Sequence, residues 1–92
     1  MLNHKEFDGG NRHRFTGLQS WKDEPVTLHV VEKGEYEFGP ATTDGICHPL
    51  FGNVQVDGVR YSSHGNGRMF KKGERLKISC EEPSVYIIWG NE

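Results

Sequence analysis

The sequence predicts an all-β fold, an antiparallel barrel or sandwich formed by a single small domain over residues 1–92. Short runs of β-branched and aromatic residues recur along the chain, separated by turn signals about every eight to twelve residues. No stretch shows the 3.6-residue period of an amphipathic helix. A chain of 92 residues has room for one core, so we expect no second domain.

Residues 26–38 have the strongest strand composition and read V-T-L-H-V-V-E-K-G-E-Y-E-F. The Lys33-Gly34 break separates two strand-like runs, residues 26–32 and 35–38. This pattern predicts two paired antiparallel strands that meet at a glycine turn.

The segment before this pair combines turn, strand and loop signals. Residues 8–10 read D-G-G and predict a turn. Residues 11–15 are expected to begin an edge strand, because their charged side chains discourage further pairing. Residues 16–25 are polar and predict a loop that is anchored by Trp21.

The clearest local signal is a hairpin within residues 54–61. An Asp57-Gly58 pair stands between two alternating runs, which predicts a two-residue type I′ turn. The register that follows places Val56 opposite Val59, with both side chains on one face.

The remaining strands are predicted from shorter patterns. Pro49 interrupts the apolar run of residues 46–51, which argues against a regular central strand there. Residues 76–80 alternate between apolar and polar side chains and predict a half-buried strand. Residues 84–89 are apolar on both faces, so they predict a central strand or a subunit interface.

Charge and composition argue against several classes of protein. The formal net charge is −2, which argues against a general nucleic-acid binder. No apolar run reaches transmembrane length, and residues 1–6 lack the pattern of a secretory signal. Cys47 and Cys80 are interpreted as two buried thiols, with a single disulfide as the open alternative. We therefore expect a cytoplasmic protein without nucleic-acid or membrane partners.

Three blocks along the chain carry a family resemblance: V-V-E-K-G-E-Y-E-F at residues 30–38, G-N-V-Q-V at residues 52–56, and the closing segment from Gly65 to Tyr86 with its E-P-S turn. Together they resemble the pyrimidine/purine nucleoside phosphorylase family of small cupin-like proteins. The resemblance implies a cupin-like antiparallel β-barrel of the jelly-roll type that forms a homodimer. It also implies phosphate-dependent cleavage of nucleosides to free base and ribose 1-phosphate, with inorganic phosphate as the co-substrate.

Phosphorolysis requires an anion site and a surface that holds the base, and positioning and electrostatics dominate its chemistry. His48 and Arg68 are predicted to be catalytic and to hold the phosphate. The predicted substrate-binding residues, which supply stacking rings and further anion contacts, are Tyr36, Arg60, Tyr61, His64 and Tyr86. The five histidines share no metal-type spacing, so no metal site and no cofactor are predicted.

Two other functions remain open from the sequence. Residues 44–51 and 70–73 depart from the family pattern, which favours a non-catalytic cupin-like module. Such a module would bind a nucleoside, a nucleotide or another small anionic ligand. The apolar strand at residues 84–89 favours an interaction or structural protein instead.

Overall fold

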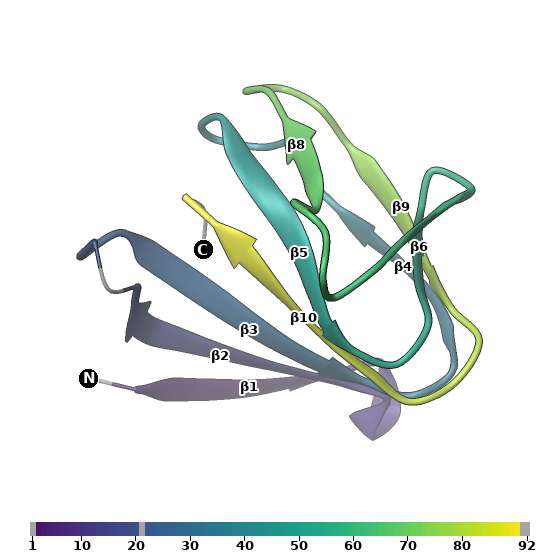
Figure 1. Ribbon diagram of the computed structural model, residues 1–92. Coiled ribbons are helices and arrows are strands. Elements are labelled where there is room, and N and C mark those ends of the chain that lie inside the picture. The colour runs from purple at the N-terminus through teal and green to yellow at the C-terminus, as the bar shows by residue number, and fades with distance from the viewer. Residues whose placement is uncertain (1, 21, 91–92) are drawn as a thin grey trace.

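The computed structural model describes residues 2–20 and 22–90 (Figure 1). Within these residues it contains β-strands, a short 3-10 helix η1 (Asp8–Gly10) and no α-helix. The strands are β1 (Asn3–Phe7), β2 (Arg12–Gln19), β3 (Pro25–Val31), β4 (Gly34–Phe38), β5 (Gly45–Phe51), β6 (Val54–Val56), β7 (Val59–Tyr61), β8 (Arg68–Phe70), β9 (Leu76–Cys80) and β10 (Ser84–Trp89). No helix in this part of the chain is long and apolar enough to cross a membrane.

The strands form two antiparallel sheets, which confirms the predicted all-β class. The larger sheet has six strands in the order β1-β2-β3-β10-β5-β8, and the smaller has four in the order β4-β9-β6-β7. In Figure 1, β1 and β2 lie at the side of the larger sheet that is farther from β6 and β9. This arrangement leaves part of the larger sheet extending past the smaller one.

The core lies between the two sheets and follows the period-two pattern of the strands. In β10, Tyr86 and Ile88 point into the core, and in β9 Leu76 and Ile78 do the same, each at most 1% exposed. Because these side chains are surrounded by other apolar groups, truncating one isoleucine to alanine would cost about 2–5 kcal/mol.

The expected closed barrel is wrong. Among the described residues, no strand of one sheet is hydrogen-bonded to a strand of the other. The physical reason is that turns, rather than ladders, carry the chain between the layers. At one such crossing the β8–β9 turn is closed by the Glu74 N–H, which donates to the Lys71 carbonyl at 3.0 Å.

The predicted pairing of the two strands in residues 26–38 is also wrong. β3 pairs with β2 and β10, whereas β4 pairs with β9 in the other sheet. Val31 of β3 and Tyr36 of β4 belong to the same buried cluster, so the strands face each other across the core. The Lys33-Gly34 break therefore moves the chain from one layer to the other.

The N-terminal expectations are corrected in a similar way. β1 is the edge strand, so β2, which begins where the sequence predicted an edge, lies inside the sheet. β2 also continues to Gln19, into the segment predicted as a loop, while Trp21 lies outside the described residues. A register shift between Phe15 and Leu18 accommodates Gly17, whose φ is +87°, and this bulge hides the alternation in the sequence.

Pro49 lies within β5, between β10 and β8, contrary to the expectation that it excludes an internal strand. β8 pairs only with residues 45–47 of β5, so its ladder stops before Pro49. The ladder with β10 shifts its register at the residues facing Pro49. The missing N–H of Pro49 is therefore tolerated, as is usual at bulges and strand edges.

Two local predictions are confirmed. The hairpin pairs Val56 with Val59, and Asp57 and Gly58 have φ values of +51° and +82°, as a type I′ turn requires. β10 is the central strand that the two-sided apolar pattern predicted, because it lies between β3 and β5.

Candidate functional site

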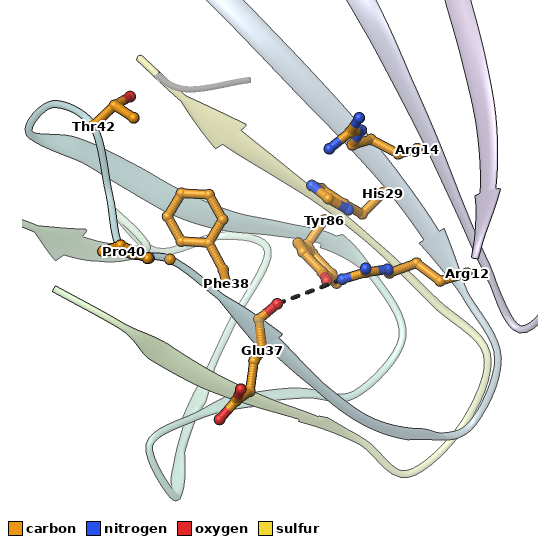
Figure 2. Close-up of a pocket in the computed structure, with 9 residues that line it drawn as sticks. Arg12, Arg14, His29, Glu37, Phe38, Pro40, Thr42 and Tyr86 are labelled. Atoms are coloured by element: carbon orange, nitrogen blue, oxygen red, sulfur yellow. Dashed lines mark hydrogen bonds between the residues drawn. The ribbon is translucent and has the colours of Figure 1, made fainter. Parts of the chain in front are cut away.

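A pocket of roughly 240 Å³ opens between the inner face of the larger sheet and the end of β4 (Figure 2). The residues that line it come from β2, β3, β4, β10 and the segment after β4. They are Arg12, Arg14, His29, Glu37, Phe38, Gly39, Pro40, Thr42 and Tyr86. We call this cavity the arginine pocket.

A row of cross-strand neighbours forms one wall of the arginine pocket. Arg14 of β2 lies opposite His29 of β3, and His29 lies opposite Tyr86 of β10. Because residues directly opposite each other share a face, all three side chains point into the pocket, as Figure 2 shows. Arg12 lies two residues before Arg14 on the same strand and therefore on the same face.

The middle of the row is a stacked aromatic pair. The ring centroids of His29 and Tyr86 are 4.8 Å apart, and their planes differ by 11°. Both side chains are buried, with 6% of His29 and 1% of Tyr86 exposed. The pair gives the pocket a flat, rigid wall against which a ligand can pack.

The two guanidinium groups have unused hydrogen-bond donors. Within the described part of the chain, the buried Nε atoms of Arg12 and Arg14 have no hydrogen-bond partner. Arg12 donates from Nη1 to the Glu37 carbonyl at 3.5 Å, and its Nε lies 3.8 Å from the exposed carboxylate of Asp8. Buried donors are normally satisfied, so these groups form a preorganised site for an acceptor, and an anion suits them best.

His29 is neutral at physiological pH. Burial, followed by the charges of Arg12 and Arg14, lowers its pKa from 6.5 to about 3. Its Nδ1 atom has no hydrogen-bond partner among the described residues. The positive charge of the pocket therefore comes from the arginines, while His29 offers a neutral ring nitrogen to a ligand.

Phe7 of the edge strand β1 contacts both guanidinium groups on the same face of the sheet. Its ring centroid lies 4.6 Å from Cζ of Arg12 and 5.0 Å from Cζ of Arg14. These cation–π contacts restrict the long arginine side chains without using their N–H donors. The guanidinium groups are therefore held in place and remain able to bind a ligand.

The chemistry available in the arginine pocket is recognition of an anion. Its polar lining includes the two guanidinium groups, the His29 ring and the Tyr86 phenol, and the Glu37 carbonyl accepts a hydrogen bond from Arg12. In the described ranges, no group of three or more His, Cys, Asp or Glu side chains is arranged to hold a metal ion. Burial also raises the pKa of the Tyr86 phenol, so Tyr86 stays protonated and can donate a hydrogen bond.

Of the residues predicted from the sequence, Tyr86 lines the arginine pocket. Tyr36 is a core residue whose hydroxyl donates to the Glu32 carbonyl at 2.8 Å. Arg60, Tyr61 and His64 come together elsewhere, where they line an open depression beside the β6–β7 hairpin.

The two predicted catalytic residues lie apart from the arginine pocket. His48 is on β5, and its Nε2 lies 3.0 Å from the Gly65 carbonyl oxygen. Arg68 on β8 pairs with Asp57 at 3.4 Å and with Glu74 at 3.2 Å. Neither residue lines the pocket that holds Tyr86.

Sequence reasoning missed Arg12, Arg14 and His29. The available signal was the alternation R-H-R at residues 12–14, which places two cations on one face of a strand. A second signal was His29, which is the one ionisable residue in residues 25–31 and shares a strand face with Thr27 and Val31. Neither signal shows which face is inward, because that depends on the register of β2 and β3.

No protein-family model matches the chain, and no curated protein matches it. Solved structures do resemble it. A protein of unknown function from Vibrio parahaemolyticus shares 18% identity over 97% of both chains, with a TM-score of 0.80. A DUF1255 protein of unknown function from Acinetobacter shares 15% identity over 99% of this chain and 91% of that one, with a TM-score of 0.70. The EutQ protein of Clostridium difficile shares 17% identity over 94% of this chain and 75% of that one, with a TM-score of 0.62.

These findings contradict the predicted membership of the pyrimidine/purine nucleoside phosphorylase family. The structures that resemble the chain are described as proteins of unknown function and as EutQ, and at 15–18% identity they show the fold alone. The resemblance depended on turn and core positions, whose residue types are set by backbone conformation and packing. At Gly52, for example, φ is +90° and an added Cβ would lie 2.3 Å from Oγ of Ser84. Such a glycine is required by this turn and carries no information about activity.

Proposed function

We propose that the protein is a cupin-like module that binds a small anionic ligand in the arginine pocket. The observation that carries this proposal is the pair of inward-facing guanidinium groups whose Nε donors have no hydrogen-bond partner among the described residues. A carboxylate or a phosphate group would satisfy these donors and offset the charge of Arg12 and Arg14.

The size of the cavity limits the ligand. Pockets for drug-sized molecules measure about 300–1,000 Å³, whereas the arginine pocket measures roughly 240 Å³. It therefore suits a phosphate or carboxylate group with a small organic part, rather than a complete nucleotide. The ring of Phe38 and the stacked rings of His29 and Tyr86 supply the apolar contacts for that part.

The proposal is tested by calorimetric titration of the protein with inorganic phosphate and with sulfate. A charge-assisted hydrogen bond contributes about 1.5–3 kcal/mol, so Arg14→Gln should weaken phosphate binding about 10- to 150-fold. Arg60→Gln is the matched control, because Arg60 lies on β7 outside the pocket and should leave the affinity unchanged. Equal affinities for the wild type and Arg14→Gln would contradict the proposal, as would the absence of binding to the folded wild type.

Phosphorolysis of nucleosides stays a prediction and is separated from binding by an activity assay. The protein is incubated with uridine, inosine or adenosine in the presence of phosphate, and free base is measured. Release of base that is lost in Arg14→Gln would make the arginine pocket part of an enzyme. Binding of phosphate without release of base supports the non-catalytic module.

We also propose that two copies pair through the outer face of the larger sheet. Val30 is 37% exposed and Phe51 67% exposed on this face, and Val85 lies between them in the register. An apolar outer face of this kind is typical of a surface that a partner covers. Light scattering after gel filtration should give the mass of a dimer, and Val85→Lys should give a monomer. A monomeric wild type would contradict the pairing.

The state of the cysteines supports a reducing compartment such as the cytoplasm. Cys47 and Cys80 are both buried and are not joined by a disulfide. Burial raises the pKa of the Cys47 thiol to about 12, so this thiol stays protonated and unreactive. Thiol titration of the purified protein without reductant should find two free thiols only after unfolding.

A further inference from the structure

Three cations surround one phenyl ring next to the arginine pocket. The ring centroid of Phe7 lies 5.3 Å from Nζ of Lys5, 4.6 Å from Cζ of Arg12 and 5.0 Å from Cζ of Arg14. We call Lys5, Phe7, Arg12 and Arg14 the cationic shelf. All four side chains come from the β1–β2 pair and share one face of it, since they occupy alternate and opposite positions.

The pairing of β1 and β2 places like charges against each other. Lys5 lies directly opposite Arg14, and Phe7 directly opposite Arg12. Like charges in directly opposite positions destabilise an antiparallel pair. Within the described residues, neither Lys5 nor Arg14 forms an ion pair, and the carboxylate nearest to the shelf, Asp8, contacts Arg12 at 3.8 Å. The shelf therefore carries a positive charge that the protein itself leaves largely unbalanced.

The cationic shelf is continuous with the arginine pocket. Arg12 and Arg14 line the pocket and also contact the Phe7 ring, so they belong to both. β1 is the edge of the larger sheet, and Figure 1 shows it on the side away from β6 and β9. A ligand that enters the pocket can therefore extend over the shelf toward Lys5.

We propose that the ligand of the arginine pocket carries two linked phosphoryl groups, one bound in the pocket by Arg12 and Arg14 and one on the shelf by Lys5 and Arg14. This inference rests on the proposed function and names the class of ligand, a diphosphate. Lys5 does not line the pocket of roughly 240 Å³, so a group bound by Lys5 would lie outside the pocket, next to the first group. The negative charge of the second group would reduce the repulsion between the positive charges of Lys5 and Arg14, which lie directly opposite each other.

The test compares calorimetric titrations with inorganic phosphate and with pyrophosphate, at an ionic strength of about 0.15 M to limit long-range attraction. The wild type should bind pyrophosphate about tenfold or more tightly than phosphate, as expected for one additional charge-assisted contact. Lys5→Gln should weaken pyrophosphate binding about three- to fivefold and leave phosphate binding unchanged.

Lys33→Gln is the matched control, because it removes the same charge from the turn between β3 and β4, where Lys33 lines a different depression together with residues of β9. It should change neither affinity. Equal binding of the two anions, or the same loss in Lys5→Gln and Lys33→Gln, would overturn the diphosphate assignment while the anion pocket itself stands. Failure of both anions to bind the folded wild type would overturn the proposed function and this inference together.

Discussion

Arg14 and Arg68 lie in the same sheet, but within residues 2–20 and 22–90 only Arg68 of the two is paired with acidic side chains. This difference distinguishes an arginine that stabilises the fold from one that can bind a ligand. Arg68 contacts Glu74 at 3.2 Å and Asp57 at 3.4 Å. Arg14 has no ion pair among the described residues, and its buried Nε has no hydrogen-bond partner there. A paired arginine stabilises the fold around it, whereas an unpaired and partly buried one is available to a ligand.

The surroundings of Arg68 support a structural role. Glu74 also accepts a hydrogen bond from the Lys71 N–H at 2.8 Å, and Asp57 accepts one from the Lys77 N–H at 3.1 Å. The cluster therefore ties the β6–β7 turn to the β8–β9 turn. The backbone hydrogen bond from Lys71, together with the hydrogen bond from Arg68, holds the pKa of Glu74 below its usual value.

The largest expected effect is stabilisation by the ligand. A ligand at 100 times its Kd raises the free energy of unfolding by about 2.7 kcal/mol. Phosphate at that concentration should therefore stabilise the wild type and Arg68→Gln equally, as measured by urea unfolding. Arg14→Gln should gain far less at the same phosphate concentration. Equal gains in Arg14→Gln and Arg68→Gln would remove the distinction between the two arginines.

His29 should make the stability of the pocket region depend on pH. Its pKa is about 3 in the folded protein, against an ordinary histidine value of 6.5, so the unfolded chain binds more protons between these values. The stabilising effect of a neutral His29 is therefore present above pH 6.5 and is lost as the pH falls toward 3. The loss between pH 7 and pH 5 is about 2 kcal/mol.

Chemical denaturation at several pH values measures this loss. His29→Gln should show a flatter dependence of unfolding free energy on pH than the wild type does. His64→Gln, in the loop after β7, is the control and should keep the slope of the wild type. A wild-type slope that survives in His29→Gln would show that His29 is not buried as a neutral ring.

A smaller effect is expected from removing the paired arginine. The side chain of Arg68 is 25% exposed, and its partners Asp57 and Glu74 are 42% and 39% exposed. Solvent weakens ion pairs at this exposure, so Arg68→Gln should lower the unfolding free energy by about 0.5–1 kcal/mol. The difference should shrink in about 1 M salt, because surface ion pairs are screened there.

The smallest effect is expected for Arg14→Gln without ligand. The substitution removes a partly buried positive charge that lies directly opposite Lys5, so it should change the unfolding free energy by no more than about 0.5 kcal/mol, and should not lower it. The same denaturation curves measure it. A loss of stability larger than that of Arg68→Gln would mean that Arg14 serves the fold rather than a ligand.

Local features of the fold were predictable from the sequence, and long-range pairing was not. The hairpin at Asp57-Gly58 depends on two residues whose backbone angles are set by their own chemistry. The apolar faces of β10 identified a central strand for a similar reason. Whether β3 pairs with β4 or with β10 depends on segments more than fifty residues apart in the sequence, such as Val31 and Ser84, and no local pattern encodes that choice.

The candidate site was predicted only in part for the same reason. Tyr86 was predicted as a ring that stacks on a base, and it lines the arginine pocket. Arg12 and Arg14 were interpreted as part of a charged edge, since nothing in the sequence shows that β1 lies outside them. The orientation of His29 toward both arginines requires the register of β2 against β3, which only the structure provides.

The row formed by Arg14, His29 and Tyr86 makes the binding site as sensitive to strand alignment as to side-chain identity. If β2 slid by one residue against β3, His13 and Phe15 would face inward and both arginines would face solvent. Such a slip could keep most backbone hydrogen bonds and yet abolish the pocket. The bulge at Gly17 accommodates one extra residue of β2 between Phe15 and Leu18, so the register at Arg14 is unaffected. A one-residue insertion or deletion within β2 is therefore expected to eliminate ligand binding even where the protein still folds.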